Sequence, residues 1–143
     1  MVELDAVDEG NWEACAALRC APGQERFVAS VSFYLCLCPY EGTWQPLAIR
    51  AGDDVVGFVM WAVDPADGSH WIGGLVIDAA RQGEGHGRAA VAALLDRFRA
   101  AGARAAALSC APENERAGAL YVSLGFRPTG ELSDGETVAR LAL

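Results

Sequence analysis

The chain has 143 residues, of which 52% are hydrophobic and 21% are charged. This length fits one domain, and this balance is typical of a globular protein and excludes a disordered chain. The net charge of −8 disfavours nucleic acid and anionic membranes as partners and favours cations, although the same charge also serves solubility. The longest apolar stretch, residues 27–38, is shorter than the ~20 residues that span a bilayer, so we expect no membrane segment.

The cysteines and histidines favour reduced thiols and argue against a metal site. Five cysteines, an odd number, lie in a chain whose first residues form neither a basic nor an apolar signal region, so we expect a cytoplasmic protein without disulfides. Cys36 and Cys38 form a C-x-C pair, but His70 and His86 are the only histidines, and neither lies at zinc-finger spacing from that pair. We therefore predict no metal.

The N-terminal third predicts one strand and two helices. Residues 2–7 alternate between apolar and polar side chains, which indicates a strand. Asp8 follows at a position suited to capping a helix over residues 9–19. A second helix is predicted over residues 24–38, and it ends before Pro39 because the residue that precedes a proline avoids helical geometry.

Three strands are predicted in the middle of the chain. Residues 47–51 and 55–63 are apolar runs separated by a Gly-Asp-Asp connector, which is typical of a hairpin. Residues 70–78 predict a further strand, in which Gly73 and Gly74 indicate a bulge or the close approach of another group.

The second half alternates between helices and strands. It predicts, in chain order, a helix that ends at about residue 101, a strand over 104–110, a helix over 113–124, and strands that begin at 126 and span 136–142. Mixed strands and helices of this kind predict an α+β or α/β fold around one central sheet.

The strongest local signal is the segment 82–88, which reads QGEGHGR between a predicted strand and a predicted helix. Glycine lets the backbone approach a ligand closely, and the start of a helix offers unpaired N–H groups and a positive dipole end. Arg81, His86 and Arg88 add positive charge in an otherwise acidic chain. The segment therefore predicts an anion site suited to a pyrophosphate, with a solvated glycine-rich turn as the alternative.

Two common phosphate-binding motifs do not fit this segment. A dinucleotide fingerprint needs its first glycine directly after the strand and an acidic residue about twenty positions later, but residues 103–108 contain no acid. A P-loop needs a G-K-[ST] sequence, which the chain lacks.

Residues 82–87 resemble the Q/R-x-x-G-x-G/A loop of the GNAT superfamily of N-acetyltransferases. Downstream, residues 114–126 (NERAGALYVSLGF) are similar to a later motif of the same superfamily. The two motifs in this order, with one strand between them, are highly specific, and the order of elements resembles the family across nearly the whole chain. Within the family, the chain is most similar to bacterial diamine and spermidine N-acetyltransferases.

The resemblance implies one domain over residues 1–143, with a central mixed, mostly antiparallel sheet that splays between its fourth and fifth strands and about four flanking helices. It also implies an enzyme that uses acetyl-CoA as cosubstrate. The acetyl group would pass to the primary amine of a small, cationic, polyamine-like acceptor by direct attack on the thioester. A homodimer is implied because family members often pair.

The same resemblance assigns residues to the cofactor. The pantetheine arm would lie along Leu75, Val76 and Ile77, where a backbone N–H would polarise the thioester carbonyl. Asn114 matches an asparagine that contacts this arm, with a helix cap as its alternative role. The pyrophosphate loop would consist of Gln82, Gly83, Glu84, Gly85, His86, Gly87 and Arg88.

Tyr121 matches the general acid of the family. A phenol with a pKa of ~10 stays protonated at neutral pH and can protonate the leaving thiolate. The alternative is a packing role, since Tyr121 lies on the apolar face of its predicted helix. The candidates for the general base are Glu41, Glu113, Glu115 and Asp78, each of which also fits a solvated surface acid.

Two departures from the family concern the acceptor. Gly74 stands where close relatives carry a bulky or charged residue, and Ala29, Cys36 and Leu37 stand where polyamine-acetylating relatives have acids. These departures weigh against a polyamine but not against acetyl-CoA. Two other functions stay open: a non-catalytic module that binds acyl-CoA, and an acetyltransferase for antibiotic, amino acid or peptide amines.

Overall fold

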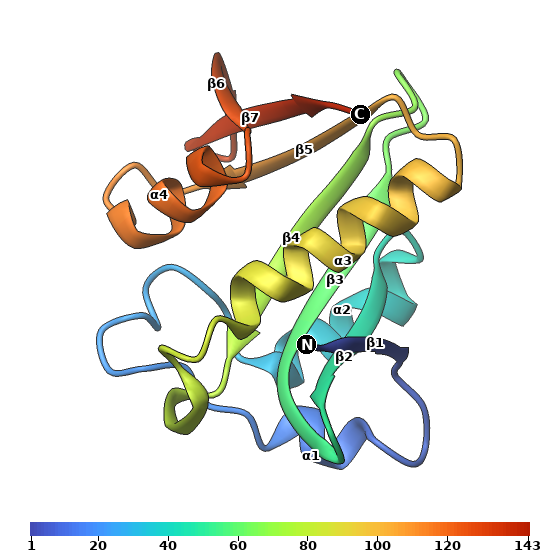
Figure 1. Cartoon of the computed structure of the whole chain (residues 1–143), viewed down its shortest axis with the longest axis vertical. Helices are drawn as coiled ribbons and strands as arrows, with labels where there is room; N and C mark the ends of the chain where they lie inside the picture. Colours follow the sequence, from blue (N-terminus) through green and yellow to red (C-terminus); the bar gives the residue numbers. More distant parts are fainter.

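One seven-stranded sheet runs through the protein, and the computed structural model describes residues 1–143 (Figure 1). The strands are β1 (Glu3–Ala6), β2 (Gln45–Ala51), β3 (Asp54–Val63), β4 (His70–Ile77), β5 (Ala105–Cys110), β6 (Arg127–Ser133) and β7 (Glu136–Ala142). Their order across the sheet is β1-β2-β3-β4-β5-β7-β6. Every neighbouring pair is antiparallel except β4 and β5, which are parallel, so the predicted mixed sheet is confirmed.

Helices cover both faces of this sheet. They are α1 (Trp12–Ala16), α2 (Val31–Glu41), α3 (His86–Ala100) and α4 (Glu115–Ser123), with a short 3-10 turn η1 (Ala79–Arg81) before α3. Figure 1 shows α3 in front of β3 and β4, and α1 and α2 behind them. None of these helices has the length and apolar character that a bilayer crossing requires.

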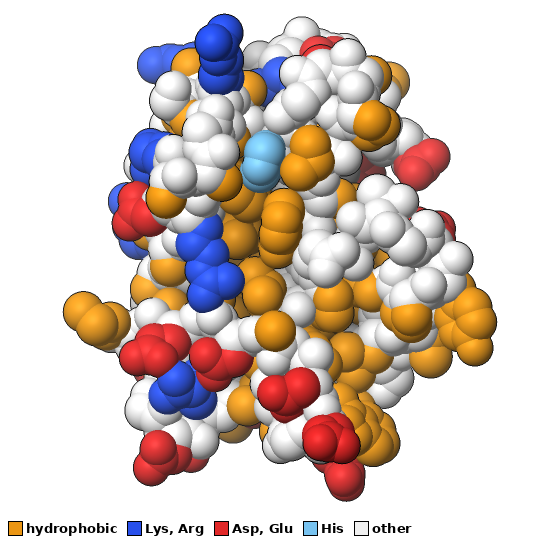
Figure 2. Space-filling model, turned by 90° about the vertical axis from the view of Figure 1, so that its right-hand side faces the viewer, with side chains coloured by type: hydrophobic (Ala, Val, Ile, Leu, Met, Phe, Trp, Pro, Cys, Tyr) orange, Lys and Arg blue, Asp and Glu red, His pale blue; other side chains and the backbone are white.

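The sheet separates two apolar cores. On one face, α3 buries the residues that its predicted apolar stripe contains, namely Val91, Leu94, Leu95 and Phe98. On the other face, Cys15 of α1 and Val31 of α2 are buried against the sheet. Successive residues of a strand point to opposite faces, and accordingly Phe58 of β3 joins the α2 side while Val59 joins the α3 side. Acidic and basic side chains lie at the surface instead, as the face drawn in Figure 2 shows.

The parallel pair of β4 and β5 is short and opens toward the carboxyl ends of both strands. Only three residue pairs are in register, and the last is Ile72 with Leu108. Figure 1 shows the two strands meeting at one end and diverging toward the other, with α4 beside β5. The predicted splay between the fourth and fifth strands is therefore confirmed, and the edge of β4 beyond Ile72 has no neighbouring strand on that side.

The glycine pair in β4 forms the predicted bulge. The register between β3 and β4 shifts between Phe58 and Met60, opposite Gly73 and Gly74. Gly74 has a φ of +61°, a left-handed conformation that side chains rarely adopt. A Cβ on Gly73 would lie 3.0 Å from the ring of Trp44, so the close approach that the sequence indicates is also present.

The predicted first helix is too long, because local side-chain contacts hold residues 8–11 in a turn. The Asp8 carboxylate accepts a hydrogen bond from the Gly10 N–H at 2.8 Å, and the Asn11 amide donates to the Ala6 carbonyl at 3.0 Å. The helix begins at Trp12, so Asp8 does not cap it. Such turn contacts compete with a helix start for the same side chains.

The predicted second helix is displaced toward the C-terminus. It begins at Val31, where the Ser30 hydroxyl caps it by accepting the Phe33 N–H at 3.2 Å. Pro39 lies inside the helix and not after it, so the expected end before Pro39 is wrong. A proline lacks one N–H donor, and here the helix continues only to Glu41, where Gly42 ends it with a φ of +70°.

Candidate active site

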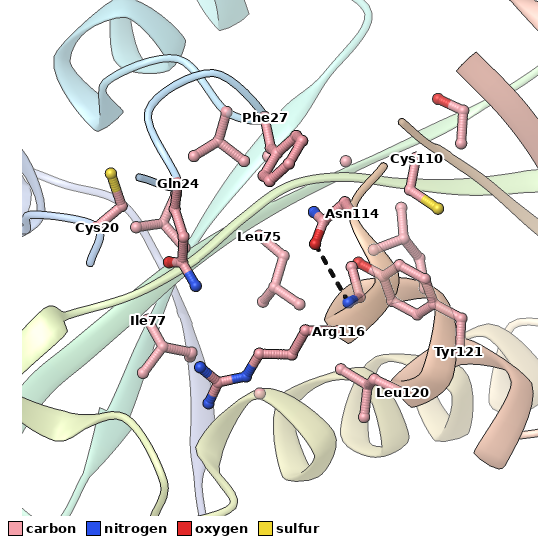
Figure 3. Close-up of a pocket in the computed structure, with 18 of the residues that line it drawn as sticks. Cys20, Gln24, Phe27, Leu75, Ile77, Cys110, Asn114, Arg116, Leu120 and Tyr121 are labelled. Atoms are coloured by element: carbon pink, nitrogen blue, oxygen red, sulfur yellow. Dashed lines mark hydrogen bonds between the residues drawn. The ribbon is translucent and has the colours of Figure 1, made fainter. Parts of the chain in front are cut away.

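The gap between β4 and β5 opens into the main cavity of the protein, which has a volume of about 690 Å³. Its walls come from the unpaired edge of β4, the loop over residues 81–88, the end of β5, α4, and the segment over residues 20–34. Figure 3 shows side chains from these elements pointing toward one another. The cavity thus joins parts of the chain that are distant in sequence.

The glycine loop leads into the start of α3 at one end of the cavity. Gly83 and Gly85 have φ values of +80° and +83°, in the left-handed region that favours glycine. Gly85 is the residue before the helix, and no side chain caps the helix there. The first N–H groups of α3 are therefore free to bind an anion, as the sequence predicts for a pyrophosphate.

The positive side chains around this loop differ in their partners. Arg81 is held by Glu84 and Asp54, both at 3.2 Å. Arg88 donates to the hydroxyl of Ser123, and its charge lies in the first turn of α3 without an acidic neighbour there. The guanidinium of Arg88 is thus available to an anion, whereas the charge of Arg81 is already neutralised.

Glu84 is the predicted cofactor residue that does not line the cavity. Its carboxylate lies 2.8 Å from Nε2 of His86 and 3.2 Å from Nε of Arg81. Hydrogen bonds from these two side chains lower the pKa of Glu84. The side chain of Glu84 therefore holds the loop in shape instead of facing the cavity.

Gln82 links three walls of the cavity through its side-chain amide. Its Nε2 donates to the Ile77 carbonyl and to Oε1 of Gln24, both at 3.1 Å. Its Oε1 accepts a hydrogen bond from Arg116 of α4 at 3.2 Å. Gln24 and Arg116 were not among the predicted site residues, and both lie in segments that become neighbours of Gln82 only in the folded chain.

The β4 residues predicted to face the cofactor arm lie along the cavity. Leu75 and Ile77 are partly exposed to it, and Figure 3 shows both side chains there. The Val76 side chain is buried in the core on the α2 side. Val76 can therefore offer the cavity its backbone groups but little of its side chain.

Asn114 and Tyr121 occupy the α4 side of the cavity. The side-chain carbonyl of Asn114 accepts a hydrogen bond from the Ala117 N–H at 3.3 Å (Figure 3). Asn114 therefore caps α4, which is the alternative role that the sequence predicts for it. The Tyr121 ring reaches the cavity beside Asn114 and packs edge-on against Phe126. Burial, and then the nearby charges of Cys110 and Glu136, raises the pKa of Tyr121 to about 12. The phenol is therefore protonated at neutral pH.

The acids that line the cavity are not the ones predicted from the sequence. Glu41, Glu113, Glu115 and Asp78 lie outside its walls, and the Asp78 carboxylate accepts the Arg19 N–H at 3.0 Å. Glu136 lines the cavity instead, together with Asp134. The sequence already predicts a last strand that begins at residue 136, and the available signal was the Asp-Gly pair at 134–135, which is typical of a hairpin turn and would have paired that strand with the one before it.

All five cysteines are free thiols, and Cys20 and Cys110 line the cavity. Burial raises the pKa of the Cys110 thiol, and the charge of Glu136 raises it further. A thiolate is the reactive form of cysteine. The surroundings of Cys110 therefore keep it protonated and unreactive at neutral pH.

The fold corresponds to that of known acetyltransferases. The structure of RimL, a ribosomal alpha-N-protein acetyltransferase in complex with coenzyme A, matches with a TM-score of 0.79 at 18% identity over 99% of this chain and 94% of that one. A spermidine N-acetyltransferase from Vibrio cholerae, in complex with CoA and spermine, matches with a TM-score of 0.76 at 19% identity over 99% and 94%.

A third structure, the aminoglycoside acetyltransferase AAC(6′)-Ib in complex with coenzyme A, matches with a TM-score of 0.78 at 19% identity over 99% of this chain and 95% of that one. A search of curated proteins found no significant sequence match. A family model matches residues 12–126, which include the glycine loop, the open strands and Tyr121. The chain belongs to the acetyltransferase (GNAT) family and is an acyltransferase that uses acetyl-CoA as its cosubstrate.

Proposed function

We propose that the protein transfers the acetyl group of acetyl-CoA to the primary amine of a small cationic acceptor, by direct attack of the amine on the thioester. One observation carries this proposal. The gap between β4 and β5 connects an uncapped, glycine-lined helix start at one end with Glu136 and several aromatic side chains at the other, and Tyr121 lines the same cavity. A single cavity can therefore hold both reactants.

At the cofactor end, the pyrophosphate would lie against the backbone N–H groups of residues 83–88, with Arg88 adding charge. The left-handed glycines and the missing side-chain cap are already present in the free protein, so the anion site does not need a bound substrate in order to form. The pantetheine arm would lie along the free edge of β4, where the backbone at Leu75–Ile77 can pair with it as a neighbouring strand would.

At the centre of the cavity, Tyr121 would protonate the departing thiolate. A free thiol has a pKa of ~8.5, so the thiolate is a weaker base than the Tyr121 phenolate, and the proton would pass to sulfur as the acetylated nitrogen gives its surplus proton to the phenol oxygen. The raised pKa of Tyr121 ensures that the phenol carries its proton at neutral pH. Asn114, which faces the same space, would contact the cofactor arm through the amide group that its cap does not use.

The acceptor end favours a cation with an apolar body. Phe27, Tyr34, Trp44 and Trp71 line it, and aromatic faces attract cations that lie within about 6 Å. Two relatives of similar fold are named for spermidine and aminoglycoside amines, which supports this acceptor class.

The experiment is a screen of acceptors with acetyl-CoA, monitored by release of the CoA thiol. Polyamines, aminoglycosides, amino acids and peptides are compared at equal concentration, at low and at high salt. We expect the highest kcat/KM with a small polycationic amine and a decline as salt rises, because charges more than ~10 Å apart are screened at 0.1 M salt. Binding of acetyl-CoA without transfer to any amine would contradict the proposal, as would a salt-independent preference for anionic acceptors.

A further inference from the structure

The β6–β7 hairpin brings two acids, Asp134 and Glu136, to the wall of the cavity. Asp134 and Gly135 form a two-residue turn with φ values of +48° and +80°, and Ser133 pairs with Glu136 across it. Positive φ at both turn residues is typical of the tight hairpins that match strand twist. Glu136 is therefore fixed as the first residue of β7, beside the end of β5 where Cys110 pairs with Thr137.

The Glu136 carboxylate accepts a hydrogen bond but has no salt-bridge partner. Its Oε1 accepts a hydrogen bond from the Ser109 hydroxyl at 2.9 Å, and no arginine or histidine forms a salt bridge with it. The residue is only partly exposed, and it lines the cavity. A partly buried carboxylate without a cation is costly, and the missing cation is what an acceptor ammonium would supply.

The charge of Glu136 acts on groups from three other elements of the cavity. It raises the pKa of Tyr34 of α2, Cys110 of β5 and Tyr121 of α4, in each case after burial has done so. Asp134 is the other acid on the cavity wall, but it is exposed at the tip of the turn. Glu136 thus lies within electrostatic reach of Tyr121, the proposed proton donor of the reaction.

We propose that Glu136 is the general base, which takes the proton from the acceptor ammonium directly or through one water before attack. This inference rests on the proposed transfer to an amine. One N–H bond of the ammonium breaks, and the proton joins the Glu136 carboxylate. The free amine forms a bond to the thioester carbonyl carbon, and the C–S bond breaks. The thiolate takes the Tyr121 proton as the acetylated nitrogen gives its surplus proton to the phenol oxygen, and Glu136 then releases its own proton to water.

The test compares Glu136→Gln with the parent on two matched acceptors. One is the best cationic amine from the screen, and the other is a fluorinated analogue whose amine is uncharged at neutral pH and needs no base. Glutamine keeps an oxygen that can accept the Ser109 hydrogen bond. Glu113→Gln, an exposed acid outside the cavity, is the control for the change in charge.

We expect Glu136→Gln to lower kcat/KM for the cationic amine by about 10²-fold, a common size for general base catalysis. The analogue should lose little, the affinity for CoA should stay unchanged, and Glu113→Gln should behave as the parent. The deficit should also shrink as pH rises toward the ~10.4 of an alkyl ammonium, where the amine arrives deprotonated.

An unchanged rate in Glu136→Gln would overturn the assignment. Equal losses on both acceptors would also overturn it, because Glu136 would then bind or position the acceptor without taking its proton. If the parent transfers to no amine although it binds CoA, the proposed function itself fails, and the role of Glu136 fails with it.

Discussion

The cofactor end of the cavity consists mainly of one continuous segment, residues 82–88, whereas the acceptor end combines side chains from α2, β4, β5 and β7. The first region offers backbone N–H groups and glycine geometry, which are insensitive to the identity of most side chains. The second offers the side chains of Glu136, Tyr34 and the tryptophans. This division suits an enzyme with a fixed cofactor and a variable acceptor, because substitutions at the acceptor end can change the acceptor without disturbing the phosphate site.

If this division is correct, changes at the centre of the cavity should alter the rate and leave cofactor affinity intact. Tyr121→Phe keeps the ring that packs against Phe126 and removes only the hydroxyl. We expect kcat to fall by about 10²-fold, with an unchanged Kd for CoA measured by calorimetry. Tyr40→Phe, at a 90% exposed tyrosine outside the cavity, is the matched control. A parent-like kcat in Tyr121→Phe would reduce Tyr121 to a packing residue.

The pH dependence of kcat in the parent protein also tests the role of Tyr121. Tyr121 has a pKa raised to about 12, so the phenol remains in its protonated, proton-donating form at every pH well below that value. We therefore expect no loss of kcat from Tyr121 between pH 7 and about 10, the ordinary pKa of a phenol. A decline in kcat that begins below pH 10 and is absent from Tyr121→Phe would contradict the raised pKa.

Changes in the glycine loop should do the opposite and weaken CoA binding. Gly85→Asn adds a side chain where backbone and phosphate would meet, and asparagine tolerates the φ of +83° better than other residues. We expect a loss of about ten-fold in CoA affinity, or about 1.4 kcal/mol. Gly68→Asn makes the same change at a φ of +75° outside the cavity and should bind CoA as the parent does. Equal affinity in both variants would place the pyrophosphate elsewhere.

The smallest effect is expected at Cys110. In the proposed mechanism the amine attacks the thioester itself, and the raised pKa of Cys110 keeps it a thiol, so Cys110→Ala should retain the parent kcat. Loss of activity with an unchanged melting temperature, together with an acetylated parent enzyme in mass spectra taken without acceptor, would indicate a covalent route.

The contrast between the two ends also explains which features could be predicted from the sequence. The loop over 82–88 and the bulge at Gly73 and Gly74 were predictable because glycine spacing is a local signal that reports backbone geometry directly. The place of Glu136 in the cavity could not be predicted from the sequence, since it depends on a hairpin and on the register of β7 with β5. That register follows from packing across the whole sheet.

The errors at the first two helices have different origins. Asp8 fits a general preference for helix caps, but its carboxylate accepts a hydrogen bond from Gly10 in a turn that also uses Asn11, so one local contact replaces another. Pro39 predicts a helix end, yet α2 continues through it to Glu41, and Val31 and Cys38 of the same helix are buried. In this second case tertiary contacts override a local preference.

The most direct test of the shared cavity is an amide chemical-shift titration of the ¹⁵N-labelled protein with CoA. The largest shifts should occur at the N–H groups of residues 83–88 and along Leu75–Ile77, with smaller ones at Asn114 and Tyr121, because the gap between β4 and β5 would hold the cofactor. Shifts confined to other surfaces, with the glycine loop and β4 unaffected, would contradict the assignment of this cavity to acetyl-CoA.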